Sequence, residues 1–253
     1  LRSGIDNINF IETPHSPKND IVFCDSVGNT CKYCYHKPHI FEGAYLKHFT
    51  TKTIEEWCIN KYVRGTADRE YDLFKLTYGI EAFFEFNERT KEKEEIMNTY
   101  IKKAERKKTN PSRIIKRGND MKVALCSIGR LENRYAIEYV EYYKKLGYDN
   151  IIIIDNNFGD EEYFEDVLQP YIDDGFVIIE SHRDEENCQV DLYTEMYNKY
   201  KDKYDWIQYS DFDEFLYIVD GSNIKEFLSQ KVFDGYDMIH VNWRNYGDNG
   251  LTS

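Results

Sequence analysis

The chain has 253 residues, of which 41% are hydrophobic and 16% aromatic, and its formal net charge is −13 at pH 7. This length allows one large α/β domain or two small ones with a substantial core. The acidic balance argues against a nucleic-acid-binding protein, which usually presents a basic face. We find no run of about 18 apolar residues that would predict a membrane span.

The opening residues do not resemble a secretory signal, so we expect a cytoplasmic protein, or one peripheral at the inner face of a membrane. Short strands are expected at residues 5–11 and 20–24, and helices at 53–65 and from about 68 to 106. Residues 105–120 are basic, contain proline and glycine, and are expected to form a linker or tail.

A cysteine cluster, CDSVGNTCKYCYHKPH, occupies residues 24–39. Its potential metal ligands are three cysteines and two histidines: Cys24, Cys31, Cys34, His36 and His39. Such a set could form a structural zinc site. Only one of the two ligand pairs usual for zinc is clear, so redox-active thiols and two reduced cysteines in a loop stay open as alternatives.

Strands and helices alternate from residue 121 onward. The predicted strands are 121–128, 148–155, 175–181, 206–211 and 236–243, and the predicted helices are 130–147, 161–174, 187–203 and 222–231. Gly147 is expected to end the first of these helices. This alternation predicts an α/β fold with a doubly wound, mostly parallel sheet flanked by helices.

Three acidic residues interrupt an apolar and aromatic run, WIQYSDFDEFLYI, at residues 206–218. Asp211 and Asp213 come at the end of the fourth predicted strand, where open α/β sheets bind ligands. Two carboxylates separated by one residue suit Mg²⁺ or Mn²⁺, with diphosphate oxygens in other positions. The alternative is a solvated turn whose aspartates cap a helix.

Several ordered motifs resemble the family-2-like and family-92-like glycosyltransferases of GT-A fold. They are CSIGRLENRYAIEYVEYYKKLGYDNIIIIDNN, DWIQYSDFDEFL and WRNYGDNG, and together they span essentially all of residues 121–253. The resemblance implies a GT-A-type sheet with a helical extension. It also implies a metal-dependent, inverting hexosyltransferase of polysaccharide biosynthesis, with a UDP-sugar as donor and a glycan or glycolipid hydroxyl as acceptor.

The same resemblance implies roles for individual residues. Asp211 and Asp213 would hold Mn²⁺ or Mg²⁺ and the donor diphosphate, and Asp155 would contact the nucleotide base or ribose. The loop after the first strand would contact the nucleotide through Ser127, Arg130 and Glu132. A helix-capping role for Glu132 and an ordinary turn role for Asp155 stay open.

An inverting transfer needs a general base near the acceptor. Asp248 in WRNYGDNG is one candidate, because it follows the fifth predicted strand, where the acceptor should lie. Glu214, which matches the acidic residue of the DxDEF form, is its rival. For Asp248 an Asp-Asn-Gly turn is an equally reasonable interpretation.

Two N-terminal motifs, NFIETPHSPKND and AYLKHFTTKTIEEWCINKYVRG, resemble the C-terminal segments of the same family. His15 and His48 would then lie near the donor diphosphate, with His15 as a third metal ligand. Phosphate would be bound by the basic residues Lys52, Lys61 and Arg64. A solvated helix face is the alternative for Lys61 and Arg64.

The family's tail therefore precedes its head, which would begin at Met121. A circular permutant, a piece of two tandem domains, and segments of one protein joined out of order all explain this inversion. We expect residues 1–104 to complete a catalytic domain whose core is 121–253. An alternative of another class is an inactive binding or interaction module, stapled by zinc through residues 24–39.

Overall fold

A computed structural model of the chain describes residues 9–10, 17–18, 23–31, 39–49, 120–186 and 188–246. The chain divides into two compact units. The first comprises Leu1–Leu46 and Ile114–Asn242, and the second comprises Lys47–Arg113 and Trp243–Ser253. The helices predicted at 53–65 and 68–106 lie outside the described residues, as does the predicted linker up to residue 119.

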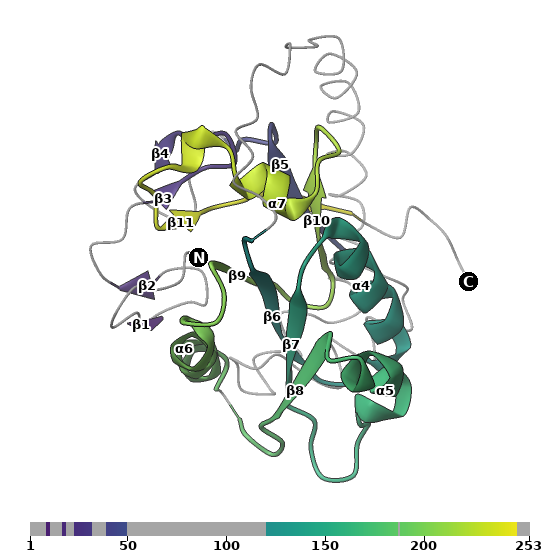
Figure 1. Ribbon diagram of the computed structural model, residues 1–253. Coiled ribbons are helices and arrows are strands. Elements are labelled where there is room, and N and C mark those ends of the chain that lie inside the picture. The colour runs from purple at the N-terminus through teal and green to yellow at the C-terminus, as the bar shows by residue number, and fades with distance from the viewer. Residues whose placement is uncertain are drawn as a thin grey trace, which may run out of the picture. The chain divides into compact units, whose positions relative to one another are not determined.

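Four parallel strands form the central sheet of the first unit (Figure 1). They are β6 (Val123–Gly129), β7 (Asn150–Asp155), β8 (Val177–Ser181) and β9 (Trp206–Tyr209), in the order β8-β7-β6-β9. Gly129 pairs with Asp155, so β6 and β7 end together at one edge of the sheet. The parallel α/β sheet predicted from the sequence is confirmed.

The β7 strand is buried on both faces. Its four isoleucines, at 151–154, are fully buried. The odd-numbered ones pack in the core that contains α4 (Asn133–Leu146), and the even-numbered ones pack in the core that contains α6 (Gln189–Tyr200). Because successive side chains of a strand point to opposite faces, helices must cover both sides of this sheet.

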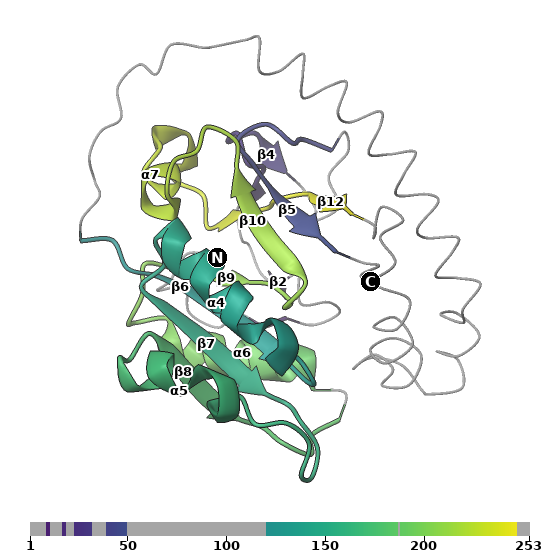
Figure 2. The same cartoon turned by 90° about the vertical axis from the view of Figure 1, so that its right-hand side faces the viewer.

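Figures 1 and 2 show α4 and α5 (Glu165–Asp173) on one face of the sheet and α6 on the other. The α4 helix buries four side chains at helical spacing: Ala136, Tyr139, Val140 and Tyr143. It is followed by Gly147, whose φ of 98° is a left-handed conformation that glycine adopts without strain. This helix end matches the sequence prediction.

The strand predicted over residues 236–243 does not join the parallel sheet. Within it, Met238–Ile239 (β11) pairs in parallel with β3 (Phe23–Cys24), which pairs antiparallel with β4 (Thr30–Cys31). A strand covered on both faces needs apolar side chains throughout, and the polar His240 interrupts this stretch. The prediction of a fifth strand in the parallel sheet is therefore wrong.

Two strands that the sequence did not predict pair with each other. They are β10 (Glu214–Ile218) and β5 (Ala44–His48), whose residues up to Leu46 belong to the first unit. The Val219 amide extends the pairing by donating to the Gly43 carbonyl over 2.9 Å. The two strands are far apart in sequence, so no local pattern links them.

Shorter elements complete the description. The helix predicted at 222–231 is α7 (Ile224–Leu228), followed by the 3-10 helix η2 (Lys231–Phe233). An antiparallel pair is formed by β1 (Asn9–Phe10) and β2 (Pro17–Lys18). None of the helices among the described residues is long and apolar enough to cross a membrane.

In the second unit the structure describes residues 47–49 and 243–246. The Tyr246 amide donates to the His48 carbonyl over 2.9 Å, which pairs the end of β5 with β12 (Trp243–Asn245).

Candidate active site

The order of the strands marks one point on the edge of the sheet. From β6 the chain runs through β7 and β8 on one side, and then returns to place β9 on the other side of β6. Ligands of open α/β sheets bind at such a reversal, outside the carboxyl ends of the strands. Arg130 follows β6 there and Asp211 follows β9, so the acidic group lies at this point.

Phe212, the residue between the two aspartates, is anchored in the core. It is 2% exposed, and its ring stacks on Tyr139 with centroids 4.6 Å apart and on Phe164 at 5.5 Å. Asp211 and Asp213, on either side of it, are only half-buried. The aromatic anchor therefore fixes the position from which the two carboxylates project.

Hydrogen bonds close the turn in both directions. The Asp211 amide donates to Oε2 of Glu214 over 3.2 Å, and the Glu214 amide donates to the Asp211 carbonyl over 3.1 Å. Nε2 of Gln189, in the first turn of α6, donates to Oδ1 of Asp211 over 3.3 Å. The backbone of the turn and one of its carboxylates are thus both held.

Glu214 is 1% exposed, and its Oε1 atom has no hydrogen-bond partner. Burial, followed by the negative charges of Asp211 and Asp213, raises the pKa of this carboxyl well above its usual range. A general base must be ionised to accept a proton. The raised pKa therefore disfavours the ionised form of Glu214 that a general base needs.

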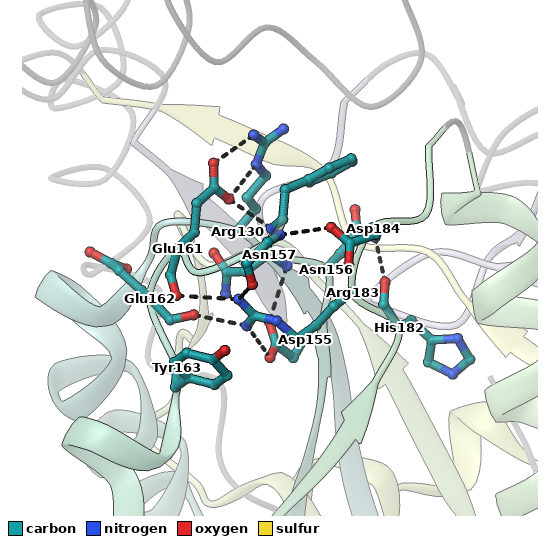
Figure 3. Close-up of polar contacts among 12 residues, drawn as sticks. Arg130, Asp155, Asn156, Asn157, Glu161, Glu162, Tyr163, His182, Arg183 and Asp184 are labelled. Atoms are coloured by element: carbon teal, nitrogen blue, oxygen red, sulfur yellow. Dashed lines mark hydrogen bonds and ion pairs between the residues drawn. The ribbon is translucent and has the colours of Figure 1, made fainter.

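Asp155, at the end of β7, is the centre of a second polar cluster (Figure 3). It is 2% exposed. Its Oδ1 accepts hydrogen bonds from the amide and the side chain of Asn157, at 3.0 and 2.7 Å, and its Oδ2 accepts one from Arg183 at 2.8 Å. Asn157 in turn accepts a hydrogen bond from the Leu131 amide over 2.8 Å. This cluster therefore ties the loops after β6, β7 and β8 together.

Arg183 holds the loop after β7 (Figure 3). Besides Asp155, its guanidinium donates to the three backbone carbonyls of Gly159, Glu161 and Glu162, over 3.0, 3.2 and 2.9 Å. It also lies 4.1 Å from the ring centroid of Tyr163. One side chain thus fixes most of the loop that borders the candidate site.

Of the three residues predicted to contact the nucleotide near β6, Ser127 lies within the strand, and Arg130 and Glu132 lie in the loop after it. Arg130 forms a bidentate ion pair with Glu161, in which its Nε donates to Oε2 over 3.0 Å and its Nη2 donates to Oε1 over 2.7 Å. Its guanidinium carbon lies 4.2 Å from the ring centroid of Phe158. Ser127 is fully buried, and its hydroxyl is 2.8 Å from that of Tyr139. Glu132 is 8% exposed, and its side chain does not cap α4.

Leu131, in the same loop, has a φ of 57°. This left-handed conformation is unfavourable for a leucine. The hydrogen bond from its amide to the buried Asn157 helps to hold it there.

Two of the three predicted metal ligands are described. Asp211 and Asp213 offer carboxylate oxygens, which suit Mg²⁺ and Mn²⁺, and both charges act on the neighbouring Glu214. Within the described ranges, no three His, Cys, Asp or Glu side chains are grouped so as to hold a metal ion. His15, the third predicted ligand, lies outside those ranges. The described pair therefore fits a divalent cation only together with further ligands.

The predicted zinc cluster is described in part. Cys24 and Cys31 are buried on the paired strands β3 and β4. Burial, with the nearby charges of Asp25 and Cys31, raises the pKa of Cys24 to about 12. Burial also raises the pKa of Cys31, so both thiols would have to lose a proton to bind zinc as thiolates. His39 is exposed and lies edge-on to Phe41, while Cys34 and His36 lie outside the described residues.

The remaining predicted site residues belong to the second unit. His48 packs against Trp243, with ring centroids 5.1 Å apart. The other four lie outside the described residues: Lys52, Lys61, Arg64 and Asp248.

The sequence was compared with models of protein families. The model of glycosyltransferase family 92 matches residues 120–250, which is more than half of the chain. The chain belongs to glycosyltransferase family 92. Searches of curated proteins and of solved structures gave no significant match.

The family 92 match covers the whole parallel sheet, its three helices and the Asp211–Asp213 turn. The resemblance read from the sequence is thereby confirmed for family 92, and the protein is a glycosyltransferase. Membership points to a nucleotide sugar as donor and a glycan as acceptor. The GT-A classification and the inverted segment order stay predictions.

Several residues that shape this family 92 site were not predicted from the sequence. They are Gly129, Asn157, Arg183, Gln189 and Phe212. For Asn157 a signal was present, because polar residues directly after a buried strand often line a ligand edge. For the others the decisive feature is a contact with a distant part of the chain, which a local pattern does not display.

Proposed function

We propose that the chain is a metal-dependent transferase that moves a sugar from a nucleotide diphosphate, namely UDP, to a hydroxyl of a glycan or glycolipid. The observation that carries the proposal is the Asp211–Asp213 turn. Two half-buried carboxylates flank a buried ring at the strand reversal of a parallel sheet. Membership in family 92 supports sugar transfer as the reaction.

Asp211 and Asp213 would hold Mn²⁺ or Mg²⁺, with His15 as a third ligand. A bound cation supplies positive charge that offsets the diphosphate of the donor and of the leaving group. The protein itself orients the two carboxylates. Phe212 anchors the turn by stacking on Tyr139, and Gln189 donates a hydrogen bond to Oδ1 of Asp211. His48, Lys52, Lys61 and Arg64 would add cationic or polar contacts to the diphosphate.

The nucleoside would lie along the loops after β6 and β7. Arg130 and Glu132 border this edge, and Ser127 supports it from the core through Tyr139. Asp155 already accepts hydrogen bonds from Asn157 and Arg183. It would therefore act on the nucleotide in one of two ways: indirectly, by holding the binding loops in place, or directly, through an oxygen lone pair that these bonds leave free.

For the acceptor, we propose Asp248 as the general base. It would remove the proton of the attacking hydroxyl while the new glycosidic bond forms and the bond to the leaving diphosphate breaks, with inversion at the anomeric carbon. Glu214 is the weaker candidate, because burial raises the pKa of its carboxyl and so disfavours the ionised form. A GT-A-type fold and a place in polysaccharide biosynthesis, in the cytoplasm or at the inner face of a membrane, complete the proposal.

A thermal-shift experiment tests the proposal. Ligand binding to the folded state raises its stability, so UDP should raise the melting temperature of the protein only when Mn²⁺ or Mg²⁺ is present. Asp211→Asn and Asp213→Asn should remove this shift and leave the melting temperature without ligand unchanged. Asp202→Asn, on an exposed turn after α6, is the matched control and should respond like the wild type.

A wild-type protein that shows no shift with UDP and Mn²⁺, but contains zinc after purification, would contradict the proposal. That result would support the alternative of an inactive module stapled through residues 24–39.

A further inference from the structure

A chain of polar groups runs through the apolar core beneath the Asp211–Asp213 turn. On β9, Trp206 packs in the core that contains α4, and Ile207 packs in the core that contains α6. Because strand side chains alternate, Gln208 and Ser210 face the α4 core, where apolar residues would be expected. Ser210 is 3% exposed, so it is as deeply buried as its apolar neighbours.

Every polar atom of the Gln208 side chain has a partner. Its Oε1 accepts a hydrogen bond from the Tyr148 hydroxyl, which lies just beyond the end of α4. Its Nε2 donates to Oγ of Ser210 over 2.7 Å and approaches the Tyr143 hydroxyl at 3.4 Å. Ser210 directly precedes Asp211 in the sequence. The chain therefore leads from α4 to the turn.

A second set of bonds holds the far side of the turn. The Tyr143 hydroxyl donates to the Glu214 carbonyl over 2.8 Å and accepts from the Leu216 amide over 3.1 Å. The Glu214 carboxyl group accepts a hydrogen bond from the Asp211 amide. One hydrogen-bond network thus holds both Ser210, before the turn, and Glu214, after it.

Such a network is not needed for a stable core. Replacing a buried polar set by apolar side chains of similar shape is often neutral or stabilising, whereas a partly satisfied set is costly. The side-chain amide of Gln208 is also held in one orientation, because its oxygen accepts a hydrogen bond from Tyr148 and its nitrogen donates one to Ser210. What the network adds beyond stability is a defined position for the turn.

We propose that Gln208, acting through Ser210 and Tyr143, is a positioning residue that fixes the Asp211 and Asp213 carboxylates at the edge of the sheet. The inference rests on the proposed function in one respect, namely that the turn presents these carboxylates to the donor and its cation. The fixing itself is a property of the free protein and can be measured without any ligand.

The test compares four variants with the wild type. Gln208→Leu and Ser210→Ala break the network at neighbouring points, and Ser210→Thr keeps the hydroxyl. Tyr204→Phe is the matched control: it removes a hydroxyl that donates to Oδ1 of Asn150 over 2.9 Å, at the opposite edge of the sheet. Tyr148→Phe, which removes only one hydroxyl, replaces Gln208→Leu if the latter does not fold.

The first readout is hydrogen exchange at the Asp211 and Glu214 amides of the free protein. Both amides should exchange about tenfold faster or more in Gln208→Leu and Ser210→Ala, at rates set by local opening. Ser210→Thr should be close to wild type, and Tyr204→Phe should leave both amides unchanged. Exchange in β7 should be equal in all five proteins. Unchanged exchange at the turn in Gln208→Leu and Ser210→Ala would overturn the inference, whatever the fate of the proposed function.

The second readout is the dissociation constant of Mn²⁺, measured from the electron paramagnetic resonance signal of the free ion. Residues that orient metal ligands typically contribute about 10–100-fold to affinity, so Gln208→Leu and Ser210→Ala should weaken Mn²⁺ binding by such a factor and Ser210→Thr should restore it. Equal affinity in all variants would overturn the inference. A wild type that does not bind Mn²⁺ contradicts the proposed function instead, and the exchange rates then decide the inference.

Discussion

The ring of Phe212 lies against that of Tyr139, with centroids 4.6 Å apart and planes inclined by 28°. One ring belongs to the turn after β9 and the other to the buried face of α4. The stack joins the acidic turn to the helix that covers the sheet. The middle residue of an Asp-x-Asp sequence is thus a core residue here, and the two aspartates are its flanks.

Phe212→Ala should therefore damage both stability and ligand binding. Loss of a buried phenylalanine costs about 3–5 kcal/mol of the free energy of unfolding, which urea denaturation measures. The folded fraction should also bind UDP with Mn²⁺ more weakly, as measured by calorimetry, because the carboxylates lose their anchor. Phe227→Ala, which breaks the buried Phe227–Phe233 pair at 5.0 Å, is the control. It should destabilise the fold similarly and spare the affinity.

Gly129→Ala should act on the same ring from the other side. A Cβ atom at this position would lie 2.7 Å from both Cζ of Phe164 and Cε2 of Phe212. Overpacking of this kind costs about 1–3 kcal/mol of the free energy of unfolding. Phe212→Leu, which shortens the obstructing side chain, should recover part of that loss in a double-mutant cycle. Additive effects of the two substitutions would show that Gly129 does not make room for Phe212.

Local pattern predicted the elements of residues 121–211 well. The isoleucine run of β7, the spacing of Ala136, Tyr139 and Tyr143, and the stop at Gly147 are all set by residues close in sequence. The position of Asp211 at a strand end followed from the same reasoning. Each of these features depends on a window of a few residues, and that is the information a single sequence displays.

Pairings and anchors between distant segments could not be predicted in this way. The β10 strand needs β5 as its neighbour, and Asp155 needs Arg183, which belongs to another loop. The stretch MIHV at 238–241 is mostly apolar and predicts a strand, but β11 within it pairs with β3 and not with the central sheet. Only the three-dimensional arrangement shows that this sheet ends with β9.

Arg183→Lys tests the cluster around Asp155. A lysine cannot reproduce the fork that donates to Asp155 and to the carbonyls of the loop after β7. We expect a loss of about 2 kcal/mol in the free energy of unfolding, because hydrogen bonds to charged groups are strong. Asp155→Asn in the Arg183→Lys background should add little further loss, since the two side chains form one unit.

The same variants separate two roles of Asp155. If this residue only holds the loops, Asp155→Asn and Arg183→Lys should weaken UDP binding, measured by calorimetry, to a similar degree. A much larger effect of Asp155→Asn would instead indicate that the carboxylate contacts the nucleotide directly. If UDP affinity in both variants equals that of the wild type, the cluster around Asp155 is not part of the UDP-binding site.

The ion pair of Arg130 and Glu161 predicts an acid-dependent contribution to stability. The hydrogen bonds from Arg130 outweigh the cost of burial and lower the pKa of Glu161 below its ordinary value of 4.5. In the pH range between the folded and unfolded pKa values, the unfolded chain binds more protons at this site, so stability rises with pH. The contribution is complete above the unfolded pKa and disappears as the pH falls through the folded pKa.

Glu161→Gln should therefore reduce stability at pH 7 but have a progressively smaller effect on acidification below about pH 4.5, where the wild type also loses the charge. Because both side chains are about a quarter exposed, the loss at pH 7 should be below about 1 kcal/mol. Urea denaturation at pH 7, 5 and 3.5 measures it. Glu165→Gln, on the exposed first turn of α5, is the control. A Glu161→Gln effect that stays constant across these pH values would show that the pair contributes through packing of Arg130 on Phe158 and not through charge.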